Sequence, residues 1–412
     1  MELPSYQSCP LVAPWFNEAR YGMFIHWGPY SVAARGEWVA NRELISREEY
    51  LSMYASRFLA EHYRPADWVE VACASGMRYV ILTTRHHDGF CLWNTETTDF
   101  NAVKIGPRRD LLRPFVEAAR NAGLRVGFYF SCADWFHCDY PSAYCRDWPS
   151  GWPDEKARER FVCFYLAQLQ ELMTSYGAID ILWYDGCIPQ PLDGERINRL
   201  VKGWQPDILI NNRNGWPHDF ICCEQTLSEP KNEQPWEACV TLNDNWGYHA
   251  GDYNWKTPRQ VAQLLARASS SGGNLLLNIG PRADGTIPED SVKILRAVGD
   301  WLCPRRHCFS GSGRSPYSWT NWGCITVNES MIFLHVFASP GTELRLANVK
   351  NRVIDVHCID SGLQLFFEQK GAVTTIWGLP PAIENGIAFT ITIKVQGKPE
   401  TLSAQTSFWI AN

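Results

Sequence analysis

The sequence predicts an α/β fold, a (β/α)8-like (TIM-type) barrel over residues 1–308 followed by a small antiparallel β-sandwich over residues 309–412. Between about residue 20 and residue 300, short apolar runs alternate with amphipathic segments, and the span is close to the ~250 residues typical of such a barrel. After about residue 310, helical periodicity vanishes and strand-like runs are separated by Gly, Pro and Asn. An open doubly wound sheet is the alternative, but no glycine-rich phosphate turn follows the first strand.

Eight apolar runs are the expected strands of the barrel. Runs this short and this apolar are typical of strands that are covered on both faces, as in a parallel sheet. They are residues 21–28, 78–84, 124–131, 179–186, 207–213, 219–225, 237–243 and 272–280. The expected strands of the sandwich lie within residues 324–337, 342–349, 353–369 and 387–397.

The segments between the barrel strands carry helix signals. Residues 46–49 (SREE) form a capping-box sequence, and residues 257–260 (TPRQ) add a proline at the first helical position. Leu111, Phe115 and Ala119 recur at helical spacing, which predicts a helix with one buried face.

The composition describes a soluble globular protein of 412 residues, with 45% hydrophobic and 20% charged residues. A net charge of −6 without blocks of like charge argues against nucleic acid or an anionic membrane as a partner. Aromatic residues make up 13% of the chain, and flat rings suit stacking on sugars as well as core packing. Aromatic side chains exposed on loops would also make a homo-oligomer plausible.

The cellular compartment is predicted from the N-terminus and the cysteines. The first twenty residues lack the basic start and apolar core of a signal peptide, and no apolar run approaches the length of a membrane span. The 15 cysteines are odd in number and form no C-x-x-C pair. We therefore expect a cytoplasmic protein with reduced thiols.

Polar side chains stand at the carboxyl ends of the expected strands, where the active site of a barrel lies. Isolated carboxylates are costly to bury, so Asp185 after the apolar run 179–184 should face an opening. Its alternative role is to cap the next helix or hold a turn, but a full circle of polar strand ends favours a site for a polar ligand. These strand-end residues are His26, His86, His87, Asp88, Tyr129, Ser131, Asp185, Arg213, Glu224 and Asn278.

Two carboxylates on different strands, Asp185 and Glu224, are the equipment of a glycosidase, in which one attacks and the other transfers a proton. A metal site is the rival interpretation. His86 and His87 are neighbours, and neighbours along a regular strand point to opposite faces, so they should not share one ion. We therefore expect no metal and no other cofactor. A nucleophilic thiol at residues 222–223 is less well supported, because Phe220 and Ile221 make this an apolar run.

Several of these stretches together closely resemble the α-L-fucosidases of glycoside hydrolase family 29. The matching stretches run in order through residues 15–288 and include FIHWG (24–28), TTRHHDGF (83–90), ILWYDG (181–186) and GGNLLLNIGP (272–281). The resemblance implies a catalytic barrel followed by a β-sandwich, which agrees with the fold predicted from the residues.

The resemblance also implies roles for individual residues. Asp185 matches the family's nucleophile, and residues 218–225 (HDFICCEQ) resemble the stretch that carries the acid/base, which places that role on Glu224. Glu229, Glu233 and Glu237 are the competing candidates. The implied sugar-binding residues, with Phe24 and Trp246 as an apolar wall for the fucose methyl group, are Phe24, His26, Glu37, Trp38, His86, His87, Tyr129, Trp183, Arg213 and Trp246.

The sequence thus predicts a retaining exo-α-L-fucosidase that hydrolyses terminal α-L-fucose from fucosylated glycans or glycosides. Two alternatives stay open: a catalytically silent fucose-binding protein on the same barrel, and a metal-dependent barrel hydrolase.

Overall fold

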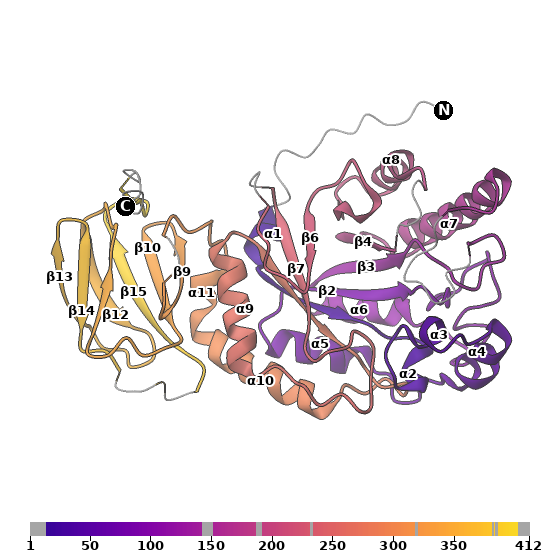
Figure 1. Cartoon of the computed structure of the whole chain (residues 1–412), viewed down its shortest axis with the longest axis horizontal. Coiled ribbons are helices and arrows are strands. Elements are labelled where there is room, and N and C mark those ends of the chain that lie inside the picture. The colour runs from indigo at the N-terminus through magenta and orange to yellow at the C-terminus, as the bar shows by residue number, and fades with distance from the viewer. Residues whose placement is uncertain are drawn as a thin grey trace, which may run out of the picture.

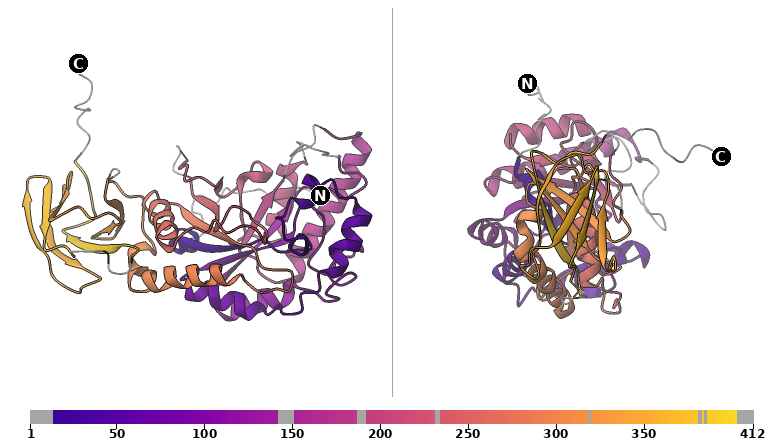
Figure 2. Two further views of the ribbon diagram at one scale, coloured as in Figure 1. Left: turned by 60° about the horizontal axis from the view of Figure 1, so that its bottom comes forward. Right: turned by 90° about the vertical axis from the view of Figure 1, so that its left-hand side faces the viewer.

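The computed structural model describes residues 14–141, 151–186, 192–230, 234–317, 320–380, 383 and 386–402. The chain forms a parallel barrel and an antiparallel sandwich, which confirms the predicted fold class (Figure 1). Figure 2 shows an elongated molecule with the sandwich at one end. Helices α2, α3 and α4, which follow the first barrel strand, lie at the other end (Figure 1).

Eight parallel strands build the barrel, in the order β5-β4-β3-β2-β1-β8-β7-β6. The two ends of this order, β5 and β6, meet at a single parallel bridge between Asn211 and Phe220. The ring is therefore weakest between β5 and β6. The strands are β1 (Tyr21–Ile25), β2 (Tyr79–Arg85), β3 (Arg125–Ser131), β4 (Ile181–Asp185), β5 (Leu209–Ile210), β6 (Ile221–Glu224), β7 (Trp236–Thr241) and β8 (Asn274–Ile279).

Helices cover the outside of the barrel. Helix α9 begins with a complete capping box between Thr257 and Gln260, as predicted. At α4 only half of the predicted box forms, because Ser46 accepts from the Glu49 backbone N–H without a reciprocal bond. The helices are α1 (Pro14–Ala19), α2 (Tyr30–Ala33), α3 (Val39–Arg42), α4 (Arg47–Met53), α5 (Pro65–Ala74), α6 (Leu112–Asn121), α7 (Glu155–Ser175), α8 (Gly194–Trp204), α9 (Pro258–Ser270), α10 (Glu289–Leu302) and α11 (Arg306–Phe309). None of these helices combines the length and hydropathy that a bilayer span demands.

The interior of the barrel is filled by inward-pointing side chains, as in other closed parallel barrels. Along β4 these are Ile181, then Trp183, then Asp185, because alternate residues of a strand share a face. Each step along the strand thus moves from the apolar interior towards the mouth, and Asp185 is the first polar group in the row.

The sandwich packs two antiparallel sheets, of order β12-β15-β10-β9 and β11-β14-β13. Its own hydrophobic core is separate from the two clusters of the barrel. The strands are β9 (Gly323–Asn328), β10 (Met331–Val336), β11 (Glu343–Leu346), β12 (Val353–Cys358), β13 (Phe366–Lys370), β14 (Val373–Trp377) and β15 (Phe389–Val395).

The barrel holds the sandwich through buried contacts of α10 and the helical turn that follows it. The Trp301 indole N–H donates to the Ala388 carbonyl at 3.0 Å, and Arg305 reaches Thr390 and Asp360. Phe309 stacks on His335 of β10, with ring centroids 4.5 Å apart. These contacts fix the sandwich on the barrel.

Three features depart from the sequence-based expectations. Strand β5 is only two residues long, and β14 was not predicted, because its Thr-rich sequence lacks a marked apolar run. Cys132 at the end of β3 is disulfide-bonded, and its partner lies outside the described residues. The expectation of reduced thiols is therefore wrong for Cys132, since pairing depends on proximity in space rather than on spacing in sequence.

Candidate active site

A small cavity of about 70 Å³ opens among the carboxyl ends of the barrel strands. Larger hollows of about 610 Å³ and 370 Å³ lie along the seam between barrel and sandwich, but among the described residues Glu229 is the only acid that lines either of them. The small cavity contains three acids, one Arg and three His. It is lined by the two expected catalytic acids and the ten expected sugar-binding residues: Phe24, His26, Glu37, Trp38, His86, His87, Tyr129, Trp183, Asp185, Arg213, Glu224 and Trp246.

Asp185 ends β4, and the backbone turns at once into the left-handed region at Gly186, where φ is 62°. Glycine adopts this conformation without the strain that a side chain would bring. The turn leaves the carboxylate at the mouth with 16% of its side chain exposed. Its Oδ1 accepts from Arg213 Nη1 at 2.7 Å, and its Oδ2 accepts from the Tyr129 hydroxyl at 2.9 Å.

Arg213 holds two carboxylates at once. It lies in the short 3-10 helix Asn212–Asn214, and its Nη2 donates to Glu224 Oε2 at 2.5 Å while its Nη1 serves Asp185. Its guanidinium also lies over the Trp183 ring, 5.3 Å from the ring centroid, and its Nε donates to the Cys222 sulfur at 3.2 Å. One planar group thus joins the ends of β4 and β6.

The pKa of Asp185 is lowered although the side chain is mostly buried. Burial alone would raise it, but His87, Arg213 and the Tyr129 hydroxyl favour the charged form and outweigh the burial. Burial also lowers the pKa of His87 to about 4, so His87 is uncharged at neutral pH. Arg213 is therefore the cation that keeps Asp185 ionised in a neutral solution.

Three neutral imidazoles line one side of the cavity. Burial lowers the pKa of His26 to about 4 and that of His86 well below its usual range. His26 Nδ1 pairs with Asn278 Oδ1 at 2.7 Å, and His87 Nδ1 pairs with Ser131 Oγ at 2.6 Å. His86 Nδ1 has no hydrogen-bond partner among the described residues. A sugar hydroxyl would satisfy such a group.

The two neighbouring histidines do not point to opposite faces, contrary to the sequence-based argument. Strand β2 ends at Arg85 after a register shift beyond Thr83, so His86 and His87 already belong to the following loop. Both side chains line the cavity, with ring centroids 4.2 Å apart. The irregularity has no signal in the sequence, which is why regular pleating was assumed.

Aromatic rings form the apolar part of the cavity. Phe24 of β1 lies 5.0 Å from Trp183 and 6.0 Å from Trp246, measured between ring centroids. Trp183 stacks on Tyr129 at 5.9 Å with an interplanar angle of 17°. The rings, which are tilted against one another, therefore give an apolar wall next to the polar imidazoles, which suits a sugar that carries a methyl group.

Glu37 and Trp38 reach the cavity from the loop that precedes α3. Glu37 is 6% exposed and accepts from the Gly247 backbone N–H at 2.7 Å. A Cβ at residue 247 would lie 3.1 Å from the Glu37 backbone nitrogen, so glycine permits this close approach. Burial raises the pKa of Glu37, and the nearby Glu224 adds to the rise. Glu37 lines the cavity and is therefore placed to hydrogen-bond a sugar hydroxyl.

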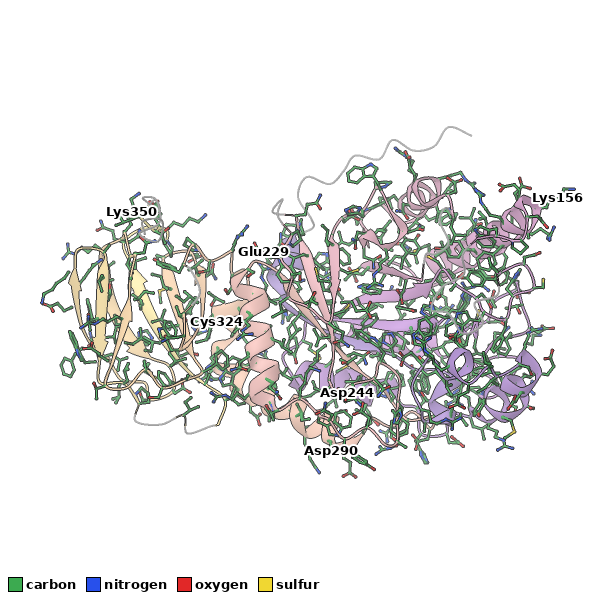
Figure 3. All side chains as sticks on the ribbon, viewed as in Figure 1. Lys156, Glu229, Asp244, Asp290, Cys324 and Lys350 are labelled. Carbon is green, nitrogen blue, oxygen red and sulfur yellow. The ribbon has the colours of Figure 1, made fainter. Side chains whose placement is uncertain are left out.

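Arg213 links Glu224 to Asp185, and 43% of the Glu224 side chain is exposed at the mouth. Of the competing candidates, Glu229 pairs with Arg314 and lines the hollows at the seam with the sandwich. Figure 3 shows Glu229 near this seam. Glu233 lies outside the described residues. Glu237 is buried within the barrel and does not line the cavity. The geometry therefore favours Glu224 as the second carboxylate.

One cluster of possible metal ligands occurs in the described part of the chain, His137, Cys138 and Asp139. It lies in the loop after β3, outside the cavity lining, and Asp139 is paired there with Arg160 at 3.0 Å. That activity needs no metal stays a prediction.

Sequence reasoning left out residues that support the lining. Trp135 contacts the rings of Trp38 and His87, with centroids 5.0 Å and 5.3 Å away. Asn278 and Ser131, which were recognised as polar strand ends without a role, hold His26 and His87. The strand-end rule identifies Asn278 and Ser131, whereas Trp135 lies in a loop and carries no sequence signal.

A barrel whose mouth holds two carboxylates on different strands, one guanidinium between them and a ring-lined pocket defines a glycoside hydrolase. A sequence model of the family Alpha-L-fucosidase matches residues 4–305. The chain belongs to the alpha-L-fucosidase family.

Individual relatives agree with this assignment. The chain is 32% identical to plasma alpha-L-fucosidase of Homo sapiens over 323 residues, which cover 70% of this chain and 67% of the relative. It is 31% identical to tissue alpha-L-fucosidase of Homo sapiens over 335 residues, covering 73% and 69%. The solved structure of alpha-L-fucosidase isoenzyme 1 from Paenibacillus thiaminolyticus superimposes with a TM-score of 0.85 at 34% identity, covering 93% of this chain and 98% of that one.

A further solved structure bears on the mechanism of the family. It is a GH29 alpha-L-fucosidase from Bacteroides thetaiotaomicron, 26% identical with a TM-score of 0.84, that covers 93% of this chain and 96% of its own. It was solved as a trapped covalent intermediate in complex with 2-fluoro-fucosyl fluoride. That relative therefore works through a covalent fucosyl-enzyme.

Proposed function

We propose that this chain is a retaining exo-α-L-fucosidase in which Asp185 is the nucleophile and Glu224 is the acid/base. The observation that carries the proposal is the bridge of Arg213 between the two carboxylates, at 2.7 Å and 2.5 Å. A retaining enzyme needs its two carboxyl groups about 5–5.5 Å apart, and adjacent nitrogens of one guanidinium favour such a short separation.

In the first step Asp185 attacks the anomeric carbon of the fucoside while the bond from that carbon to the departing oxygen breaks. Glu224 gives its proton to that oxygen. Asp185 can attack because Arg213, Tyr129 and His87 favour its charged form. The product is a β-fucosyl ester of Asp185, in which the carboxylate has lost its charge.

In the second step water attacks the ester, Glu224 takes its proton, and Asp185 is released as a carboxylate. Ester formation removes the negative charge of Asp185 and leaves Glu224 as the remaining carboxylate partner of Arg213. Two inversions leave the α configuration of fucose unchanged.

The cavity supports recognition of one terminal sugar. Its small volume of about 70 Å³ suits a single terminal sugar rather than an internal one. Fucose offers three ring hydroxyls and a C5 methyl group. His26, His86 and Glu37 would serve the hydroxyls, and the wall of Phe24 and Trp246 would receive the methyl group.

The test is hydrolysis of an aryl α-L-fucoside followed by proton NMR. The parent protein should release α-L-fucose first, before mutarotation, and Asp185→Ala should lose nearly all activity while its circular dichroism matches the parent. Release of β-L-fucose would contradict retention. Activity of a folded Asp185→Ala variant within tenfold of the parent would contradict the role of Asp185. A parent that binds fucose without turnover would instead be a silent fucose-binding protein.

A further inference from the structure

Glu237 is a carboxylate buried in the barrel without a cation. It is the second residue of β7, its exposed fraction is 0%, and it lies beside the apolar cluster that fills the barrel. No Lys, Arg or His of the described residues forms an ion pair with it. Burying an acid without a cation is costly, and an apolar side chain would fill the space at less cost. The barrel core alone therefore gives no reason for an acid at this position.

Two hydrogen bonds hold the Glu237 carboxylate. Its Oε2 accepts from the Tyr79 hydroxyl of β2, and its Oε1 accepts from the Trp183 indole N–H of β4 at 3.1 Å. Trp183 lines the sugar cavity, one inward-facing position below Asp185. Because the indole N–H is held at one end, the Trp183 ring cannot turn about its own axis without losing this bond.

Trp183 in turn contacts both groups that hydrogen-bond the two oxygens of Asp185. Tyr129 stacks on its ring, with centroids 5.9 Å apart, and donates to Asp185 Oδ2. The Arg213 guanidinium lies over the ring at 5.3 Å from the centroid and donates to Asp185 Oδ1. A rotation of the Trp183 ring would displace both donors.

We propose that Glu237 is a positioning residue for the nucleophile: it fixes the Trp183 ring, which keeps Tyr129 and Arg213 aligned on Asp185. The inference rests on the proposed role of Asp185 as nucleophile. Glu237 does not touch the substrate in this arrangement, since it lies beneath Trp183 and outside the cavity lining. This positioning role gives Glu237 a function that is distinct from proton transfer.

The chemistry of the carboxyl group predicts which substitutes can do the same work. Burial raises the pKa of Glu237 to about 7, against the effect of its hydrogen bonds to Tyr79 and Trp183. In either protonation state one carboxyl oxygen of Glu237 can accept from the Trp183 indole N–H. The other oxygen accepts from the Tyr79 hydroxyl when Glu237 is ionised and donates to it when it carries the proton. Gln offers the same acceptor and donor, so Glu237→Gln should keep the ring in place. Leu has a similar size and offers neither.

The experiment compares pH profiles of kcat/KM for an aryl α-L-fucoside, whose acidic limb reports the ionisation of the nucleophile in the free enzyme. In Glu237→Leu the limb should move to higher pH, because misaligned Tyr129 and Arg213 favour the Asp185 carboxylate less. A small displacement at the reacting centre also lowers kcat/KM, by about 10²-fold. In Glu237→Gln the limb should stay at the parent position.

Two further variants separate positioning from a merely structural role. Tyr79→Phe removes the other hydrogen bond of Glu237 and spares Trp183, so its limb should stay in place even if the protein is less stable. Trp183→Phe removes the indole N–H from the other end of the bond, so its limb should move. Adding Glu237→Leu to Trp183→Phe should then move the limb no further, because both substitutions remove the same bond.

The outcomes decide the inference. A folded Glu237→Leu variant with a parent-like limb overturns it, as does a Glu237→Gln variant with a limb as displaced as that of Glu237→Leu. If Glu237→Leu does not fold, Trp183→Phe decides, and an unmoved limb overturns the inference. An active Asp185→Ala variant would instead remove the proposed nucleophile. The two failures are therefore distinguishable.

Discussion

Replacing Glu224 with Ala tests proton transfer separately from the attack by Asp185. Glu224 ends β6 at the mouth, and 43% of its side chain is exposed. Its removal opens a solvent-accessible space next to Arg213, whose Nη2 loses its partner. The pair of Arg213 Nη1 with Asp185 Oδ1, at 2.7 Å, does not involve Glu224 and should remain. The variant should therefore keep a working nucleophile and lose only the acid/base.

The size of the loss depends on the leaving group. General acid–base catalysis contributes about 10²–10⁴-fold to a rate, or about 3–5 kcal/mol of the barrier. A sugar leaving group needs the proton, so kcat/KM for a fucosylated oligosaccharide should fall by about that factor. An activated aryl group departs without it, so kcat/KM for the aryl fucoside should fall much less. With the aryl fucoside, hydrolysis of the fucosyl-enzyme should then become rate-limiting, which lowers both kcat and KM.

Added azide should restore the second step. The unpaired guanidinium of Arg213 would attract the azide anion into the space that Glu224 leaves, and azide needs no base to attack the fucosyl-enzyme. The product should be α-L-fucosyl azide, because the configuration inverts twice. Rescue of an Asp185→Gly variant should instead give β-L-fucosyl azide, because azide then displaces the leaving group directly. The anomeric coupling constant in the NMR spectrum distinguishes the two products.

Two results would refute the assignment of Glu224. The first is an equal loss for both leaving groups, which would mean that Glu224 does not supply the proton. The second is α-L-fucosyl azide from a Glu237→Ala variant with no rescue of Glu224→Ala, which would move the acid/base role to Glu237. Circular dichroism of each variant provides the control for folding.

Three other predictions use separate parts of the structure. Arg213→Lys cannot hold both carboxylates, so kcat/KM should fall by roughly 10²-fold and the acidic limb of its pH profile should move up; an unchanged profile would contradict the bridge. Dialysis against EDTA should leave the rate unchanged, and a loss that Zn²⁺ restores would support a metal-dependent hydrolase. Burial lowers the pKa of His335 in the sandwich to about 3, below its unfolded value, so its stabilising contribution is lost as the pH falls from about 6.5 towards 3. Between pH 7 and pH 5, urea unfolding should therefore show a stability decrease that is about 2 kcal/mol smaller in His335→Gln than in the parent; equal decreases would contradict a lowered pKa of His335.

The overall fold was predictable because its signals are long and repeated. Eight apolar runs with helices between them leave few alternatives to a barrel, and the rule that sites lie at carboxyl ends then brings His26, Asp185 and Arg213 to one mouth. These residues come from strands far apart in sequence, yet the parallel arrangement alone places them together. Their roles in catalysis remain predictions.

Other details of the site depend on geometry that the sequence does not encode locally. Glu224 and Glu237 both lie on barrel strands, but Glu224 is the last residue of β6 and Glu237 the second of β7. The expected ranges 219–225 and 237–243 anticipate this difference, but the hydrogen bond that joins Glu237 to Trp183 across the barrel has no local signal in the sequence. The same holds for His86 and His87, whose orientation follows from the register shift between Thr83 and Arg85 and the loop that comes after β2.

The placement of the sandwich has a practical consequence for handling the enzyme. It packs against α10 and α11 at one end of the elongated molecule, whereas the segments after β1 that help to form the mouth lie at the other (Figure 1). A resin, a fluorescent label or a fused domain could be attached through the sandwich sheet β11-β14-β13, which lies farther from the barrel (Figure 1). The mouth would then face away from the attachment. Immobilised enzyme should then process large fucosylated glycoproteins as readily as free enzyme does, because the support stands behind the barrel rather than in front of it.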